Sequence, residues 1–471
     1  MTMTTHGSRT RAIVPLLALV LTAATACNTD SLAPDDHGRP IPFASKEERG
    51  SNRNDGSNWG QRGRIVDVTW LRTLTKVEAA EALLARNPGP GALEAFDTLY
   101  NVEQYTLNYT TINDKGEGTT ASAAVFVPDV VVGTRLPLVS FSHGTQTDKQ
   151  KVPSTLAFIN PQGIINAAHG SVTVLADYLG MGVDAEHGHP YLVPSADARS
   201  TLDALRATRR FVKTLGLSLD GRLFLYGYSE GGGVAMQLAR EIEENSRSGF
   251  RVTASAPMAG AYAVYEVGKE ALSKPTPSVQ GSGPTVYFLS SYQKVYHLAD
   301  DMSQVLVPPF DALGEELITV GMTDARAASV FPNRAPRDVM QPAIIDGWAN
   351  DPESPVSRAL RANQTYMWAP RAPMRLYYGA ADVTVQPRNT ILADSIMRDL
   401  GAADVQVVAW PGLNHVQAQW PSYISARRWF DTFPVTSDDE DENVDDDADN
   451  DDDHDRVLGS EAVLARHGSR P

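Results

Sequence analysis

One serine of this chain lies between two glycines in a pattern that could make it a nucleophile. The segment reads Gly227-Tyr228-Ser229-Glu230-Gly231. It follows an apolar run, residues 223–226, and precedes residues 233–242, which have the composition of a helix. On a sharp strand-to-helix turn a serine oxygen is lifted clear of the backbone, and the outer glycines leave room for the turn. We therefore predict that Ser229 is a catalytic nucleophile.

A serine nucleophile needs a histidine as its base and a carboxylate that orients the histidine. Asp382 follows a predicted strand at residues 374–378, and His415 follows another at residues 405–410. Open sheets of parallel strands place their sites at the carboxyl ends of the strands, so these side chains are expected to meet Ser229 there. The order serine, acid, histidine is typical of one large hydrolase fold. We predict His415 as the base and Asp382 as the orienting acid.

Other histidines and acids of the chain suit these roles less well. His143 precedes the serine, which is the wrong order for the base. Three more aspartates lie between Ser229 and His415, but they fall within or after a predicted helix and are interpreted as surface carboxylates; they are Asp394, Asp399 and Asp404.

The oxyanion formed during acyl transfer needs two preorganised N–H donors. The turn itself would supply the amide of Glu230. The second donor is expected from residues 142–146, the loop after a predicted strand at residues 136–142, and the amide of Thr145 is the best candidate.

Possible metal ligands occur at Glu186-His187-Gly188-His189. A third ligand at a fitting spacing is not evident, so we expect no metal site there. Asp177, at the end of a predicted strand, is interpreted as a buried structural hydrogen-bonding residue near the site. The acidic residues near the carboxyl end lack the central glycine and closing glutamate of an EF-hand loop, and only weak cation association is expected of them.

Strand-like and helix-like segments alternate through most of the chain, which predicts an α/β fold with a mostly parallel central sheet covered by helices. A β-hairpin is predicted at residues 102–127, before the alternation begins. The alternation stops between residues 262 and 372, a stretch rich in proline, methionine and aromatic residues. We interpret it as an inserted, mainly helical cap. Its apolar residues 305–310 could line an acyl groove, although forming the cap's own core is the commoner purpose of such a run.

The two ends of the chain differ from its middle. Residues 1–26 have the charged, apolar and small-residue regions of an export signal. Cys27, the single cysteine, follows that signal directly, residues 27–63 are predicted to be a polar tether, and residues 435–471 an acidic disordered tail. Thirteen acidic residues of this tail account for most of the net charge of −16. The remainder is nearly neutral, which argues against nucleic-acid binding.

Taken together, these motifs resemble the secretory lipase family of α/β-hydrolases. The resemblance covers residues 65–433 and rests on segments that include residues 142–145, 176–180, 189–191, 227–232, 379–382 and 412–415. It implies an α/β-hydrolase core at residues 64–261 and 373–434, a cap at residues 262–372, ester or lipid substrates and no cofactor. The residues around Cys27 resemble a lipobox, which implies lipidation and a protein anchored in the cell envelope; plain secretion is the alternative.

The leading hypothesis is a serine ester hydrolase, either a lipase or a carboxylesterase. A serine peptidase would use the same three residues, but the chain shows no propeller-like repeats before the sheet. A non-catalytic, surface-anchored binding protein on the same scaffold is the other alternative, and the presence of all three residues argues against it.

Overall fold

A computed structural model describes residues 62–85, 98–158, 160–273 and 282–435. The predicted export signal with Cys27, nearly all of the predicted tether and nearly all of the acidic tail lie outside the described residues. No helix within the described ranges combines the length and the apolar character that crossing a membrane requires.

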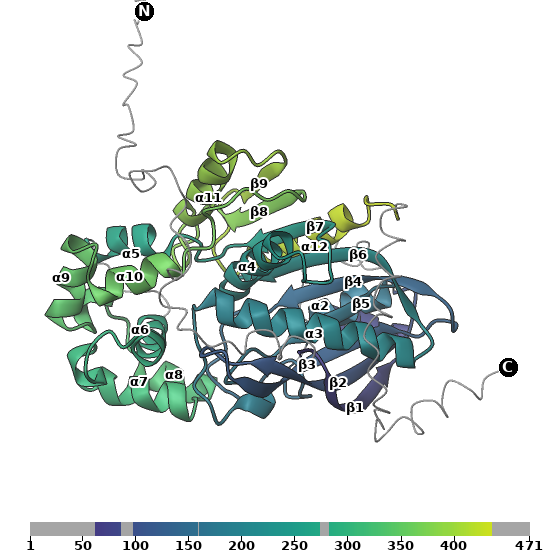
Figure 1. Cartoon of the computed structure of the whole chain (residues 1–471), viewed down its shortest axis with the longest axis horizontal. Helices are drawn as coiled ribbons and strands as arrows, with labels where there is room; N and C mark the ends of the chain where they lie inside the picture. The colour runs from purple at the N-terminus through teal and green to yellow at the C-terminus, as the bar shows by residue number, and fades with distance from the viewer. Residues whose placement is uncertain (1–61, 86–97, 159, 274–281, 436–471) are drawn as a thin grey trace, which may run out of the picture. The chain divides into compact units, whose positions relative to one another are not determined.

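The described strands form a single sheet in the order β1-β2-β3-β5-β4-β6-β7-β8-β9 (Figure 1). Pairing is antiparallel from β1 to β5 and parallel from β5 onward, so five of the eight pairings are parallel. The strands are β1 (Ile65–Leu74), β2 (Val102–Ile112), β3 (Gly118–Pro128), β4 (Arg135–Ser142), β5 (Val172–Ala176), β6 (Ser218–Tyr228), β7 (Ala254–Met258), β8 (Met374–Gly379) and β9 (Val405–Trp410).

Helices cover both faces of this sheet. The helices of the core are α1 (Lys76–Leu84), α2 (Pro161–Ala168), α3 (Pro194–Thr214), α4 (Glu230–Glu244), α11 (Arg388–Asp399) and α12 (Gln419–Phe430), with a short 3₁₀ helix η3 (Gly182–Asp184). Helices α3 and α4 pack against each other and on the sheet. Helices α1, α2 and α12 bury apolar side chains in a separate cluster with Phe224 and Tyr226 of β6. Because alternate residues of a strand face opposite sides, this arrangement buries β6 on both faces.

Most of the predicted core elements are present within a few residues of their expected ends, including the hairpin of β2 and β3. One strand and one α-helix of the core were missed. β1 is an edge strand with both faces partly exposed, so its sequence has no clear period of two. The eight residues of α2 are all buried, so this short helix has no solvent-exposed face, and only Gln162 and Asn166 are polar.

The described residues between β7 and β8 are mainly helical, as the sequence predicted. The cap helices are α5 (Val264–Leu272), α6 (Gly283–Tyr296), α7 (Phe310–Thr319), α8 (Asp324–Val330), α9 (Pro342–Asn350) and α10 (Pro355–Ala362), with 3₁₀ helices η4 (Met302–Gln304) and η5 (Pro336–Asp338). Figure 1 shows α5 to α10 grouped at one end of the sheet.

The apolar run at residues 305–310 belongs to the interior of the cap. Val305, Leu306 and Phe310 are buried in a cluster formed mainly by cap helices. None of these three residues lines the large cavity described below. The expectation that this run might line an acyl groove is therefore wrong, and the alternative, that it forms the cap's own core, is confirmed.

Candidate active site

Ser229 lies between the end of β6 and the start of α4 with φ 62° and ψ −123°, a conformation that only a constrained turn imposes on a residue other than glycine. A Cβ atom at Gly227 would lie 2.2 Å from the Gly231 carbonyl oxygen. A Cβ atom at Gly231 would lie 2.0 Å from the Ser142 carbonyl oxygen. Glycine is thus required at both positions by the close approach of three backbone segments.

The three residues predicted to act together form one hydrogen-bonded chain. His415 Nε2 lies 3.0 Å from Ser229 Oγ, and His415 Nδ1 lies 2.6 Å from Asp382 Oδ2. The other oxygen of Asp382 accepts hydrogen bonds from the backbone amides of Thr384 at 2.8 Å and Val385 at 2.9 Å. These amides fix the carboxylate, and the carboxylate orients the imidazole with Nε2 toward the serine.

The rejected aspartates lie elsewhere. Asp394 pairs with Arg398 one turn further along α11, at 2.8 Å, and its partner is half exposed. Asp404 accepts from the side chain of Gln406 at 3.0 Å, on an exposed surface. Their interpretation as surface carboxylates agrees with these contacts.

Tyr228, next to the serine, contributes in a way that sequence reasoning missed. Its hydroxyl donates to the His415 carbonyl oxygen at 2.6 Å, and its ring lies 5.1 Å from the imidazole. Tyr228 therefore holds the loop that carries the histidine. The sequence shows that the serine motif contains a tyrosine. It could not show which group the hydroxyl contacts, because that partner lies 187 residues away in the chain.

The loop after β4 lies against the serine turn. A Cβ atom at Gly144 would be 3.7 Å from Ser229 Cβ, and the Thr145 hydroxyl is 3.1 Å from that of Tyr191. The Tyr178 hydroxyl donates to the His143 carbonyl oxygen at 2.9 Å, and burial lowers the pKa of the His143 ring. These hydrogen bonds fix the loop that carries Thr145, and the carbonyl oxygens of Ser142 and His143 lie close to Gly231 in the first turn of α4.

Asp177 is the buried structural residue that the sequence predicted. It is fully buried and accepts hydrogen bonds from the hydroxyl of Ser122 at 2.6 Å and from the backbone amide of Ser154 at 2.9 Å. Its backbone carbonyl faces the ring of His143 at 3.3 Å. Asp177 thus ties the strand β5 to the loop that carries Thr145.

An open cavity of about 1590 Å³ lies between the core loops and the cap. Ser229, Asp382 and His415 all contribute to its wall. Other lining residues are Thr145, Tyr191 and Trp420 from the core and Tyr287, Phe288, Ala328 and Phe331 from the cap. This volume exceeds the usual 300–1,000 Å³ of small-molecule sites.

A family model for secretory lipases matches residues 161–246, which include the serine turn and α4. The predicted resemblance to the secretory lipases is confirmed. The search of curated proteins found no match.

Solved structures share this fold. The rice cell wall degrading esterase LipA from Xanthomonas oryzae is 25% identical with a TM-score of 0.67, covering 78% of this chain and 96% of its own. Candida antarctica lipase A in its closed state is 15% identical with a TM-score of 0.57, covering 81% of this chain and 85% of its own. The chain therefore has the α/β-hydrolase fold with a helical cap. The proteins that it resembles are esterases and lipases.

Proposed function

We propose that this protein is a serine ester hydrolase that acts through an acyl-enzyme intermediate. The observation that carries the proposal is the hydrogen-bonded chain from Ser229 Oγ through His415 to Asp382, at the wall of an open cavity. Similarity to the secretory lipases and to the esterase LipA supports an ester as the substrate.

The geometry suits a two-step reaction. Ser229 Oγ attacks the ester carbonyl carbon as its proton moves to His415 Nε2, and Asp382 stabilises the resulting imidazolium. The amides of Glu230 and Thr145 would donate to the oxyanion. The alcohol leaves with the proton from His415, and a water molecule, activated by the same histidine, then releases the carboxylic acid.

The decisive experiment is hydrolysis of p-nitrophenyl esters from acetate to palmitate by the wild-type protein and by Ser229→Ala. Loss of the nucleophile should lower kcat by a factor on the order of 10⁶ if the residues act as a unit. A fluorophosphonate probe should label the wild-type protein at Ser229 and leave the variant unlabelled.

Two aspartates give a matched control for the acid. Asp382→Asn should lower kcat by about 10⁴, because the amide holds the imidazole in the wrong tautomer. Asp394→Asn, on the exposed side of α11, should leave kcat unchanged. Equal activity of wild-type and Ser229→Ala proteins, or equal losses in the two aspartate variants, would contradict the proposed mechanism.

We also propose that the protein is exported and anchored in the cell envelope by lipidation of Cys27. The proposal is supported by the small residues Ala24-Thr25-Ala26 before the cysteine and the apolar run before them. Globomycin should block processing of the wild-type precursor, and the mature protein should need detergent for extraction. Processing of Cys27→Ala that proceeds like the wild type would argue for plain secretion instead.

A further inference from the structure

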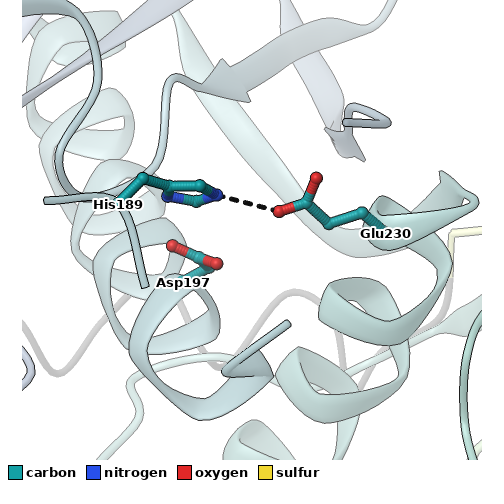
Figure 2. Close-up of side chains that lie close together, drawn as sticks. All are labelled: His189, Asp197 and Glu230. Atoms are coloured by element: carbon teal, nitrogen blue, oxygen red, sulfur yellow. Dashed lines mark hydrogen bonds and ion pairs between the residues drawn. The ribbon is translucent and has the colours of Figure 1, made fainter. Parts of the chain in front are cut away.

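Three ionisable side chains meet beside the serine turn without taking part in the Ser229–His415–Asp382 chain. Figure 2 shows His189, Asp197 and Glu230 directed toward one another. One possible ligand atom from each lies within 4.8 Å of those of the other two, and all three side chains are buried. His189 comes from the loop before α3, Asp197 from the first turns of α3, and Glu230 from the first residue of α4.

Asp197 stands apart from the other buried carboxylates. Its side chain is fully buried, yet neither oxygen has a hydrogen-bonding partner among the described residues, and Glu230 Oε2 also has none. The Leu179 backbone gives Asp197 a weak favourable contact that falls short of hydrogen-bond geometry. By contrast, buried Asp203 accepts from Arg62 and Arg206. A buried carboxylate without a donor calls for a proton or a cation.

The histidine is oriented as a metal ligand would be. His189 Nδ1 lies 2.8 Å from the Leu179 carbonyl oxygen and must donate to it, because a carbonyl only accepts. In the neutral ring the lone pair is then on Nε2, which faces Glu230 Oε1 at 2.9 Å. Metal-binding histidines usually donate their other ring N–H to a carbonyl or carboxylate in this manner.

The charge of the cluster also suits a divalent cation. Once His189 and Asp197 have given up their protons, the neutral imidazole and the two carboxylates carry a charge of −2, which a divalent cation balances. Among the described residues, no lysine or arginine forms an ion pair with Asp197 or Glu230, and Glu230 pairs with His189. One nitrogen and two carboxylate oxygens form a donor set that zinc accepts, whereas calcium prefers oxygen alone.

We propose that His189 Nε2 and one carboxylate oxygen from each of Asp197 and Glu230 bind a single zinc ion. Binding requires neutral His189 and ionised Asp197, so the proton between His189 and Glu230 and the proton on Asp197 pass to solvent. His187 lies two residues before His189 in the sequence but is not a ligand. Its ring is half exposed and forms a hydrogen bond with Asp184 at 2.8 Å.

The site follows from residues that sequence spacing could not connect. Asp197 is eight residues beyond His189 and Glu230 forty-one residues beyond it, and they meet because α3 packs against α4. Zinc there would bridge the loop before α3 to the first residue of α4. Since Glu230 also begins the helix at the serine turn, the ion would stabilise that turn independently of any ester chemistry.

The test is zinc binding to the untagged full-length protein after dialysis against a chelator. Equilibrium dialysis with elemental analysis should find one tightly bound equivalent of Zn²⁺, above any weak binding by the acidic tail. Zinc should raise the Tm of the wild-type protein, since a ligand of the folded state stabilises it. Calcium at the same concentration should do neither.

Two variants make the result specific. Asp197→Asn keeps the shape of the side chain and should weaken zinc binding by more than the roughly 10- to 100-fold that loss of an outer partner costs. His187→Ala, two residues from the proposed ligand, should bind zinc like the wild type. Absence of a tight equivalent, or equal binding by wild-type and Asp197→Asn proteins, overturns the site. Both results are read without ester hydrolysis and so leave the proposed reaction untouched.

Discussion

At the scale of single residues, the protein stabilises its buried carboxyl groups in different ways. Asp382 receives two backbone amides and an imidazole, and Asp177 receives hydroxyl groups and an amide. Asp197 receives neither, and burial together with the charge of Glu230 raises its pKa to about 8, although His189 opposes this rise. Without a bound cation, Asp197 is therefore protonated at neutral pH.

This assignment predicts how stability changes with pH in the presence of a chelator. The folded state holds the Asp197 proton up to about pH 8, whereas the unfolded chain releases it near pH 4. The folded state thus binds more protons between these values, and this group lowers stability as pH rises, by up to about 1.4 kcal/mol per pH unit. The Asp197→Asn variant has no titrating group at this position, so its stability does not fall with pH for this reason. The difference in unfolding free energy between variant and wild type, from urea titrations, should favour the variant increasingly from pH 5 to pH 8. A constant difference would mean that Asp197 is ionised throughout.

At the scale of elements, the first turn of α4 decides whether the site forms. Two backbone carbonyls from the end of β4 and its loop approach Gly231, with distances of 2.0 Å from Ser142 O and 2.5 Å from His143 O to a Cβ placed there. Gly233, in the same helix, has its nearest neighbour at 3.8 Å, the Pro194 side chain. The two glycines therefore differ in what a methyl group would displace.

Gly231→Ala should force the loop that carries Thr145 away from the serine turn. We expect kcat for p-nitrophenyl butyrate to fall by at least about 10²-fold, the cost of losing one oxyanion donor, and Tm to fall as well. Gly233→Ala should keep its activity and gain as much as about 1 kcal/mol of stability, since alanine favours a helix interior. Kinetics and thermal unfolding of the two variants test directly whether the Ser142 and His143 carbonyls approach Gly231 closely. Full activity of Gly231→Ala would show that the loop does not pack as described.

These elements also show what could be predicted from the sequence. Ser229, Asp382 and His415 each follow a strand by a few residues, so a local pattern places them at the same edge of the sheet. The hydrogen bond from Tyr228 to the His415 loop depends on packing between segments far apart in the chain, and so does the proximity of Asp197 to Glu230. The spacing of residues in the sequence does not reveal such contacts. The exposed strand β1 and the fully buried helix α2 lack the periodicity from which elements are recognised.

At the scale of the whole catalytic unit, the cap is held on the core by contacts around the cavity. The ring of Tyr287 in α6 stacks on Tyr191 of the core with centroids 4.3 Å apart. Lys149 of the core donates to the Thr319 carbonyl oxygen at the end of α7, at 3.0 Å, and the Met322 amide donates to the Thr147 carbonyl oxygen at 2.7 Å. Helix α8 follows directly and borders the cavity, so it is positioned to limit the substrate's length.

Narrowing the cavity at α8 should shorten the acyl chain that the protein accepts. Ala328 lines the cavity and is exposed, so Ala328→Trp adds bulk to its wall without disturbing the cap's core. Each methylene group that no longer fits forfeits roughly 0.8 kcal/mol, about fourfold in kcat/KM. The ratio of palmitate to acetate ester hydrolysis should therefore fall by more than about tenfold. Ala325→Trp, exposed on the same helix but outside the cavity, is the control and should keep the wild-type ratio. If both variants retain that ratio, the acyl chain does not reach α8, and the core loops must set its length.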